Sequence, residues 1–224
     1  AAAPKAPPFV IKSTSSEHLL ELDAFDIHLG KISWSPETGG DNYDLGIASH
    51  DFRAAVEDIL QKAAMFRLGR ALFPIGNDLL HSDTKQGTTT AGTPLDNDSR
   101  YHKSFSLVRR MMTRAVDALR EVAPVHILVI PGNHDTLSAW HLGDSLECYF
   151  HKCKDVTIDN SPSMRKYYQW GKVMLMLTHG NKGKLADYPL VMATEQPKMF
   201  GETTWREAQT GDKHQLKVQE HHGV

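Results

Sequence analysis

The sequence predicts an α/β protein in which two packed sheets carry helices on their outer faces, a four-layer α/β/β/α sandwich. Three observations lead to this prediction. Strand and helix patterns alternate as far as residue 150, a largely aliphatic run at 125–130 is typical of a strand buried on both faces, and the patterns that follow are mainly those of strands. A parallel first half followed by a more antiparallel second half favours two sheets that pack against each other.

The first half is expected to run strand, helix, strand, helix, strand. The strands are apolar-rich segments at 19–25, 71–75 and 125–130, and each leads into polar residues. Between them, apolar residues recur at helical spacing in two segments: Phe52, Val56, Ile59, Leu60 and Ala63 in the first, and Phe105, Val108, Met112, Ala115, Val116 and Leu119 in the second. Asp51 is the expected N-terminal cap of the first helix.

The second half is expected to begin with a helix and to continue with strands. The helical pattern covers 137–150, and strands are predicted at 156–158, 166–170 and 173–177. Gly171-Lys172 is typical of a hairpin turn. Two segments lack periodicity: 87–94, rich in Thr and punctuated by Gly and Pro, is expected to be a long surface loop, and 183–210 a loop with short helices.

Length and composition indicate one folded domain. The chain has 224 residues, of which 40% are hydrophobic, enough to bury a substantial core. Residues 17–224 are expected to form this domain, and the Ala- and Pro-rich residues 1–16 a flexible tail. No apolar run approaches the length of a membrane span, and the spacing of Cys148 and Cys153 on one predicted helix does not favour a mutual disulfide. A cytoplasmic protein with reduced thiols and no membrane partner is therefore expected.

The formal net charge of −2 argues against a uniformly basic surface for nucleic acid but leaves room for a local basic groove. Arg109, Arg110 and Arg114 form a cluster on the second predicted helix. A solvated helix face is the ordinary interpretation of such a cluster. It is a weak indication of nucleic-acid binding.

Short polar motifs follow the predicted strands along the chain. They are Asp26-Ile27-His28, Gly76-Asn77-Asp78, Gly132-Asn133-His134-Asp135, Thr178-His179-Gly180 and Gly211-Asp212-Lys213-His214. Carboxylate, amide and imidazole groups at the carboxyl ends of strands meet along one edge and can hold two metal ions. A lone histidine after an apolar strand is more often a buried structural residue, so the motifs carry weight only together. Together they indicate metal-assisted attack of water on a phosphoester.

Taken in order, these motifs resemble those of the calcineurin-like metallophosphoesterase superfamily. The form Asp26-Ile27-His28-Leu29-Gly30-Lys31 is especially similar to that of the SbcD-type DNA-exonuclease branch, and the other motifs are similar to those of small phage-encoded members. The resemblance covers roughly residues 19–214. It implies the four-layer α/β/β/α metallophosphoesterase sandwich with a binuclear metal site at one edge. Because family members generally continue beyond the last motif, either a short second sheet or a truncated C-terminal end is expected.

Carried over residue by residue, the resemblance implies two ligand sets. Asp26, His28 and His214 are expected to hold one metal ion, and Asn133 and His179 the other. Two divalent ions are implied, with Mn²⁺ the first choice and Fe, Zn²⁺, Mg²⁺ or Ni²⁺ as alternatives.

A carboxylate after the second strand is expected to bridge the two ions, because it can give one oxygen to each and hold them about 3.5–4 Å apart. Asp78 is the preferred bridge. In the family pattern an Asp directly follows the Gly, whereas here Asn77 intervenes, so that a one-residue shift is required. Asn77 is the weaker alternative, since a neutral amide bridges cations poorly.

The resemblance implies that His134 is the general acid or transition-state stabiliser for the leaving oxygen. An imidazole suits this role because its unperturbed pKa of about 6.5 allows proton donation near neutrality. Asp135 is expected to orient the His134 ring. His81, three residues after Asp78, could contact substrate or support a ligand, or could be a polar residue on a short turn.

The last motif departs from the family pattern, which ends in Gly-His-x-His. Asp212 stands where the first of these histidines is expected, and His214 occupies the second position. A carboxylate can still ligate Mn²⁺ and would favour a harder metal. Asp212 is therefore expected either to ligate or to point away and leave the second ion one donor short.

The expected function is divalent-metal-dependent hydrolysis of phosphodiester bonds, with DNA as the favoured substrate and a nuclease as the favoured subclass. Two other functions remain open. One is a small-nucleotide phosphodiesterase or phosphomonoesterase, and the other is a scaffold that keeps the fold without catalysis, which the substitution at Asp212 and the inserted Asn77 would explain. The choice between a monomer and a homodimer is also open.

Overall fold

The computed structural model describes residues 17–215 and 217–220, and its centre is a four-stranded parallel sheet. The strands lie in the order β1 (His18–Glu21), β2 (Leu68–Gly76), β3 (Val125–Ile130) and β4 (Val156–Asp159), and each neighbouring pair is parallel. Because all four strands run the same way, their carboxyl ends lie along one edge of the sheet.

The two central strands are buried on both faces, as the aliphatic run at 125–130 predicts. Alternate side chains of β2 and β3 enter different cores: Phe73, Ile75, Ile127 and Val129 pack with the helices, and Leu72, Leu128 and Ile130 pack on the opposite face. The bounds of β3 match the prediction. β1 ends at Glu21, before the predicted end at residue 25, although the Leu22 N–H still donates to the Leu72 carbonyl.

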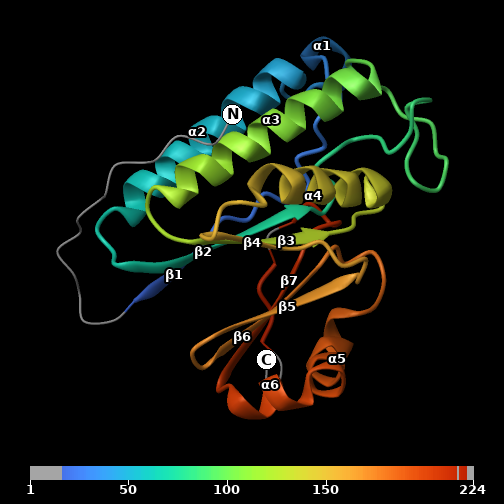
Figure 1. Cartoon of the computed structure of the whole chain (residues 1–224). Helices are drawn as coiled ribbons and strands as arrows, with labels where there is room; N and C mark the ends of the chain where they lie inside the picture. The colour runs from blue at the N-terminus through green and yellow to red at the C-terminus, as the bar shows by residue number, and fades with distance from the viewer. Residues whose placement is uncertain (1–16, 216, 221–224) are drawn as a thin grey trace.

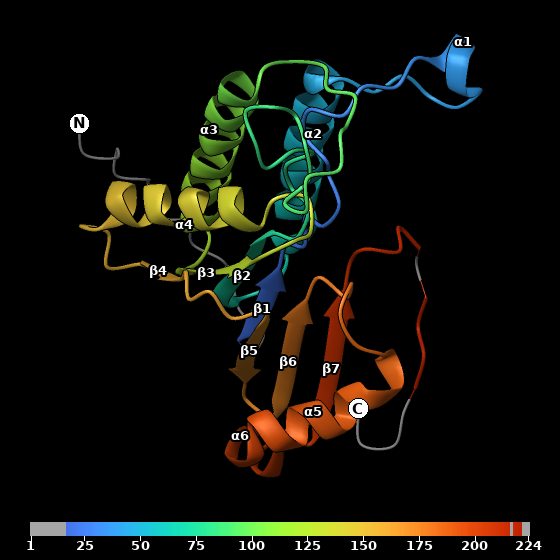
Figure 2. The same ribbon diagram turned by 90° about the vertical axis from the view of Figure 1, so that its right-hand side faces the viewer.

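Three helices cover one face of this sheet, as Figure 1 shows: α2 (Leu45–Ala63), α3 (Tyr101–Arg120) and α4 (Thr136–Phe150). Their apolar stripes form the main core with β2 and β3, which confirms the helical spacing read from the sequence. The expected cap was wrong. The Asp44 carboxylate accepts the Ile47 N–H at 2.8 Å and begins α2, whereas Asp51 lies inside the helix. A single turn, α1 (Ser35–Thr38), lies on an arm that projects from the body (Figure 2).

A second sheet contains β5 (Arg165–Trp170), β6 (Val173–Thr178) and β7 (Trp205–Thr210), in that order. β5 and β6 form the predicted hairpin through Gly171, which has a φ of 56°. β7 pairs in parallel with β6, with Thr178 beside Thr210. The prediction of a loop with short helices across 183–210 was therefore wrong for its last six residues, because Trp-Arg-Glu-Ala-Gln-Thr is a mostly polar edge strand without clear alternation.

Short helices cover the outer face of the second sheet: η1 (Leu185–Asp187), α5 (Tyr188–Glu195) and α6 (Pro197–Glu202), seen below the strands in Figure 2. Met174 and Met176 of β6 pack with Tyr188 and Met192. The other face of β6 contributes Leu175 and Leu177 to a cluster with Leu72, Leu128 and Ile130. The predicted α/β class is confirmed, and the two sheets contact each other through this cluster.

The Thr-rich stretch 87–94 is a loop with residues 90–94 exposed, as expected, but part of it is tied to the body. Thr89 is buried, and the Thr90 N–H donates to the Asn133 carbonyl at 3.2 Å. Thr88 and Pro94 form an antiparallel bridge. Hydroxyl and backbone groups of this segment bond to each other and to the turn after β3, and for this reason the segment packs on the body.

The remaining expectations concern the ends of the chain, the thiols and membrane crossing. The predicted tail, residues 1–16, lies outside the described residues. Cys148 is in α4 but Cys153 lies beyond its end, contrary to the expectation of one shared helix, and both are free thiols. Within 17–215 and 217–220, no helix combines the length and the apolar character needed to cross a membrane.

Candidate metal centre

The turns after five strands bring the motif residues together at one edge. β1, β2 and β3 are parallel and are followed by Asp26, His28, Asn77, Asp78, Asn133 and His134; β6 and β7 are parallel and are followed by His179, Asp212 and His214. The two sheets thus present side chains from positions as far apart as Asp26 and His214 to a common place.

The first group contains Asp26, His28 and His214, which have potential ligand atoms within 4.8 Å of one another. The Nε2 atoms of His28 and His214 lie 3.2 Å apart, and His214 Nε2 lies 3.6 Å from Asp26 Oδ1. His28 is buried, whereas the His214 side chain is 52% exposed. These are the residues that the resemblance assigns to one metal ion, and the group opens to solvent at His214.

The second group surrounds the fully buried ring of His179. Three oxygens lie near its Nε2: Asn133 Oδ1 at 2.5 Å, Asp78 Oδ2 at 3.3 Å and Asp212 Oδ1 at 3.6 Å. On the other side of the ring, Nδ1 lies 2.5 Å from Asn77 Oδ1. A single N–H at Nε2 cannot be directed at three oxygens, whereas these oxygens and the nitrogen lone pair together are a suitable donor set for a cation.

Asp78 lies between the two groups. Its Oδ2 is 3.3 Å from His179 Nε2 and 3.9 Å from His28 Nε2, and its Oδ1 accepts the His134 backbone N–H at 2.8 Å. Asn77 instead contacts the far nitrogen of His179. The position expected of a bridging carboxylate is therefore that of Asp78. Asn77 accepts from the imidazole Nδ1 and so leaves Nε2 as the nitrogen that faces the oxygens.

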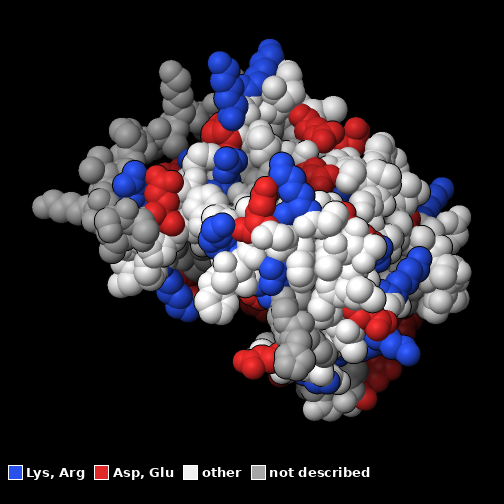
Figure 3. Space-filling view, turned by 90° about the horizontal axis from the view of Figure 1, so that it is seen from below, with Lys and Arg blue, Asp and Glu red and all other residues white. Residues whose placement is uncertain are grey.

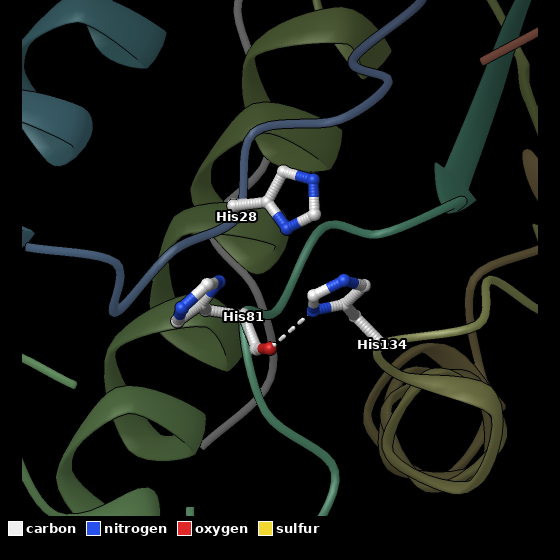
Figure 4. Close-up of side chains that lie close together, drawn as sticks. All are labelled: His28, His81 and His134. Atoms are coloured by element: carbon white, nitrogen blue, oxygen red, sulfur yellow. Dashed lines mark hydrogen bonds between the residues drawn. The ribbon is translucent and has the colours of Figure 1, made fainter. Parts of the chain in front are cut away.

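A third group is formed by His28, His81 and His134, whose nearest ring nitrogens also lie within 4.8 Å of one another. Figure 4 shows the three rings gathered in one place, with the His134 Nδ1 directed at the His81 carbonyl at 2.7 Å. The His28 and His134 rings meet edge to face, with centroids 4.6 Å apart. Nδ1 of His134 donates to this carbonyl, which leaves its Nε2 available for exchange of a proton with a substrate oxygen.

Contrary to the expectation, the Asp135 carboxylate does not orient the His134 ring. It is fully buried and accepts three backbone N–H groups, from Gly132 at 3.1 Å, Asp78 at 3.2 Å and Leu80 at 3.2 Å. These bonds tie the turn after β2 to the turn after β3. Asp135 thus fixes the backbone that carries Asp78 and His134, and the His81 carbonyl orients the ring.

Strained backbone is concentrated in these turns. Within the described residues, six that are not glycine have a positive φ: Asp26, His28, Asn77, Asp78, Asp212 and His214, with values from 48° to 67°. Each is a motif residue. The left-handed region costs an L-residue roughly 1–2 kcal/mol, and Asn, Asp and His tolerate it better than other types. Such outliers cluster at functional sites because they direct side chains that a relaxed turn would place elsewhere.

Two motif glycines allow a close approach to these carboxylates. A Cβ at Gly132 would lie 2.1 Å from Asp78 Oδ1, and a Cβ at Gly211 would lie 2.5 Å from Asp26 Oδ2. Both distances are far below van der Waals contact. Any side chain at either position would displace a carboxylate that belongs to the site.

The pKa shifts of the site residues run in both directions. Those of His28, His81 and Asp78 favour the neutral imidazole and the ionised carboxylate, whereas those of His179 and Asp26 oppose them, because burial raises the pKa of the Asp26 carboxyl. Burial, together with the neighbouring His134, lowers the pKa of His28 to about 3 and that of His81 to about 4. Burial acts to raise the pKa of Asp78, but the contacts with His179 and with the His134 backbone outweigh it and the net shift is downward. Burial acts to lower the pKa of His179, and the Asp78 carboxylate outweighs it and raises that pKa. A neutral imidazole and an ionised carboxylate are the forms that ligate metals.

Sequence reasoning missed one residue, Asp83, and left another, His81, undecided. The Asp83 carboxylate accepts the backbone N–H groups of Leu137 at 3.1 Å and Ser138 at 2.8 Å, and also the Thr90 hydroxyl at 2.6 Å. It caps α4 from a loop distant in sequence and joins the Thr-rich segment to the helix. The spacing of Asp78, His81 and Asp83 after β2 was the available signal, but a cap supplied by another loop has no local pattern.

Comparison of the chain with family models, with curated proteins and with solved structures gives no match. The chemistry of the site therefore rests on its own geometry. Three carboxylates, an amide oxygen and five imidazoles converge on one partly open place, at the ends of strands that pack into two cores. Such a set can hold divalent cations.

Proposed function

We propose that this chain is a divalent-metal-dependent phosphoesterase that hydrolyses phosphodiester bonds, with DNA as the favoured substrate. The observation that carries the proposal is the position of Asp78 between the Asp26–His28–His214 group and the oxygens around His179. Two adjacent ligand groups joined by one carboxylate are what a two-metal hydrolytic site requires.

The residues fit a pair of cations. His28 Nε2 and His214 Nε2 face each other at 3.2 Å. His179 Nε2 faces three oxygens, and a single N–H could satisfy only one of them. Asp26, His28, His214 and Asp78 would hold one ion, and Asp78, Asn133, His179 and Asp212 the other. The mixture of imidazole and oxygen donors suits Mn²⁺, and Fe, Zn²⁺, Mg²⁺ and Ni²⁺ are the alternatives. The pair, when bound, would activate water and neutralise charge on the phosphate.

The protein's own groups perform the other tasks. Asn77 accepts from His179 Nδ1 and fixes the orientation of that ring. Asp135 locks the two turns that carry Asp78 and His134. His134, whose Nδ1–H is held by the His81 carbonyl, would act in its doubly protonated form, giving the Nε2 proton to the leaving oxygen and becoming neutral.

We further infer that the two sheets and their helices form the four-layer α/β/β/α sandwich of metallophosphoesterases. The contact of Leu175 and Leu177 with Leu72 and Leu128 between the sheets supports it. So do the helices that cover the outer face of each sheet (Figure 1). The nuclease subclass rests on the resemblance of Asp26-Ile27-His28-Leu29-Gly30-Lys31 to the DNA-exonuclease branch.

The test is metal binding and hydrolysis with the same preparation. Protein stripped with EDTA is titrated with Mn²⁺ in a calorimeter, and the loaded protein is given bis-p-nitrophenyl phosphate and end-labelled single- and double-stranded DNA. We expect two equivalents of Mn²⁺ and hydrolysis of both kinds of substrate. Asp78→Asn should bind less metal and lose hydrolysis, while Asp159→Asn, an exchange of the same kind at the end of β4, should change neither.

The outcomes separate the alternatives. Hydrolysis of the small diester without cleavage of DNA would favour a small-nucleotide phosphodiesterase. Absence of Mn²⁺ binding together with absence of hydrolysis would contradict the proposal and favour a scaffold. Asp212, which stands where the family pattern has a histidine, is the observation that suggests a scaffold.

A further inference from the structure

A polar groove lies between α3 and α4, apart from the candidate metal centre. It has a volume of about 310 Å³ and is lined by Arg109, Arg110, Thr113, Arg114, Asp117, Ser145 and Tyr149. The three arginines and Tyr149 are exposed. The lining residues come from both helices. α3 and α4 lie next to each other in both ribbon views (Figures 1 and 2).

The three arginines have no ion pair or side-chain hydrogen bond with any residue in the described part of the chain. By contrast, Arg53, Arg67, Arg120 and Arg165 each contact a carboxylate. Asp117 is the one acidic residue among the described residues lining the groove, and its carboxylate accepts from Arg120 at 3.2 Å. Arg110 and Arg114 lie one helical turn apart, where like charges oppose the helix. The positive charge of the groove is therefore left for a ligand.

The molecule as a whole is not basic. The chain has a net charge of −2, and on the face seen from below in Figure 3, which is not the face of the groove, Lys and Arg are interspersed with Asp and Glu. A general basic character does not explain the groove. Guanidinium groups bind phosphate oxygens in pairs, and the hydroxyls of Thr113 and Ser145 can donate to the same oxygens.

The position of the groove points to an extended ligand. α4 begins beside His134, and Ser145 and Tyr149 lie nine and thirteen residues after its first residue, Thr136, or roughly 14 and 20 Å along the helix axis. A nucleic-acid strand bound at the metal centre could reach this groove after a few nucleotides. Tyr149, which is 50% exposed, offers a ring on which a base can stack. The volume of the groove, about 310 Å³, lies at the lower end of the range of small-ligand sites.

We propose that the groove of Arg109, Arg110 and Arg114 binds the phosphate backbone of single-stranded DNA and holds the strand whose end is at the metal centre. The choice of DNA rests on the proposed function. The binding itself does not need catalysis and can be measured without metal.

The test is fluorescence anisotropy of a labelled 20-nucleotide single strand in EDTA, at several salt concentrations. The groove variant is the triple change Arg109→Ala, Arg110→Ala and Arg114→Ala. The matched control is Arg53→Ala, Lys62→Ala and Arg67→Ala, which removes the same charge from exposed residues that are already ion-paired. We expect the groove variant to bind at least about tenfold more weakly and to lower the salt slope by about 2. We expect the control to lose less than about threefold.

Equal weakening in both variants, or in neither, would overturn the inference. Binding of poly-glutamate as tight as that of DNA, or loss of a dimer in the groove variant alone on size-exclusion chromatography, would also overturn it, because the surface would then serve another partner. Hydrolysis of bis-p-nitrophenyl phosphate separates the two proposals. If wild type hydrolyses the diester but the groove variant binds DNA as tightly as wild type, only this inference is contradicted. If the groove variant binds DNA more weakly but wild type has no hydrolytic activity, only the proposed function is contradicted.

Discussion

An aspartate lies at or just beyond the end of two strands of the parallel sheet, and the two carboxylates have opposite surroundings. Asp78, two residues after the end of β2, is 2% exposed, has a φ of 61° and lies 3.3 Å from His179 and 3.9 Å from His28. Asp159, at the end of β4, accepts from the buried Lys166 ammonium at 2.9 Å, and the same ammonium donates to Ser161 at 2.7 Å. One carboxylate is surrounded by imidazoles on a strained turn, and the other is neutralised by a lysine.

The difference teaches what distinguishes a site from a structural polar cluster. At Asp159 one fixed charge, the Lys166 ammonium, and the Ser161 backbone N–H at 2.9 Å satisfy the carboxylate. At Asp78 the neighbours are titratable groups that can be neutral, and several oxygens compete for one imidazole nitrogen. Polar residues after a strand therefore indicate a site only when their partners leave ligating capacity unused.

Among the substitutions that test the difference between Asp78 and Asp159, Asp78→Asn is expected to have the largest effect. We expect kcat/KM for bis-p-nitrophenyl phosphate with Mn²⁺ to fall by about 10³ or more, roughly 4 kcal/mol in the barrier, because an amide cannot replace a bridging carboxylate. Stability should change little, since Asn tolerates the left-handed backbone that Asp78 adopts. The measurement is steady-state kinetics with a urea melt of the same sample. Loss of activity with a collapse of stability would show that Asp78 is structural like Asp159.

The next effect is expected from His134→Ala. We expect kcat to fall by roughly 10²–10³ while two Mn²⁺ still bind, because His134 would act on the leaving oxygen and its backbone N–H to Asp78 survives the substitution. The readout is kcat together with calorimetric metal stoichiometry. A loss of metal with unchanged kcat per bound metal would instead make His134 a ligand.

The main elements of the fold could be predicted from the sequence because their signals are local. The aliphatic run of β3 and the apolar stripes of period 3.6 in α2 and α3 each lie within one segment. β7 could not be predicted, because it is an edge strand that owes its formation to pairing with β6. Asp44, which caps α2, could not be found because the apolar pattern read from the sequence begins only at Phe52, after the first turns of the helix.

The site was predictable in its residue types but not in its connections. The order of Asp26, His28, Asp78, Asn133 and His179 along the chain was enough to expect them at one edge, and the structure brings them together. The contacts that hold the site join distant loops. Asn77 to His179, Asp135 to the turn after β2, and Asp83 to α4 depend on which turns become neighbours in the fold. No spacing in the sequence encodes these neighbours.

A smaller effect, in stability alone, is expected from Asp159→Asn. Lys166 is 1% exposed and would keep its charge while losing its carboxylate partner. We expect the free energy of unfolding to fall by about 1–2 kcal/mol, less than for a fully buried pair because the Asp159 side chain is 36% exposed. Hydrolysis should stay within about twofold of the wild-type rate. Urea unfolding provides the measurement, and an activity loss beyond tenfold would show that the two strand ends are not independent.

The smallest effect is the dependence of stability on pH that His81 contributes in metal-free protein. Burial lowers its pKa from about 6.5 in the unfolded chain to about 4 in the folded protein, so between these values the unfolded state binds a proton that the folded state does not. This contribution to stability is present above pH 6.5 and is lost as the pH falls toward 4. Between pH 7 and pH 5 we expect wild type to lose about 1–2 kcal/mol more than His81→Asn, measured by urea melts in EDTA. The matched exchange His50→Asn, at an exposed histidine of α2, should leave the wild-type pH dependence unchanged. If His81→Asn and wild type lose stability in parallel over this range, the imidazole is protonated in the folded protein, and the contrast between a neutral His81 at the metal centre and the fixed Lys166 cation at Asp159 does not hold.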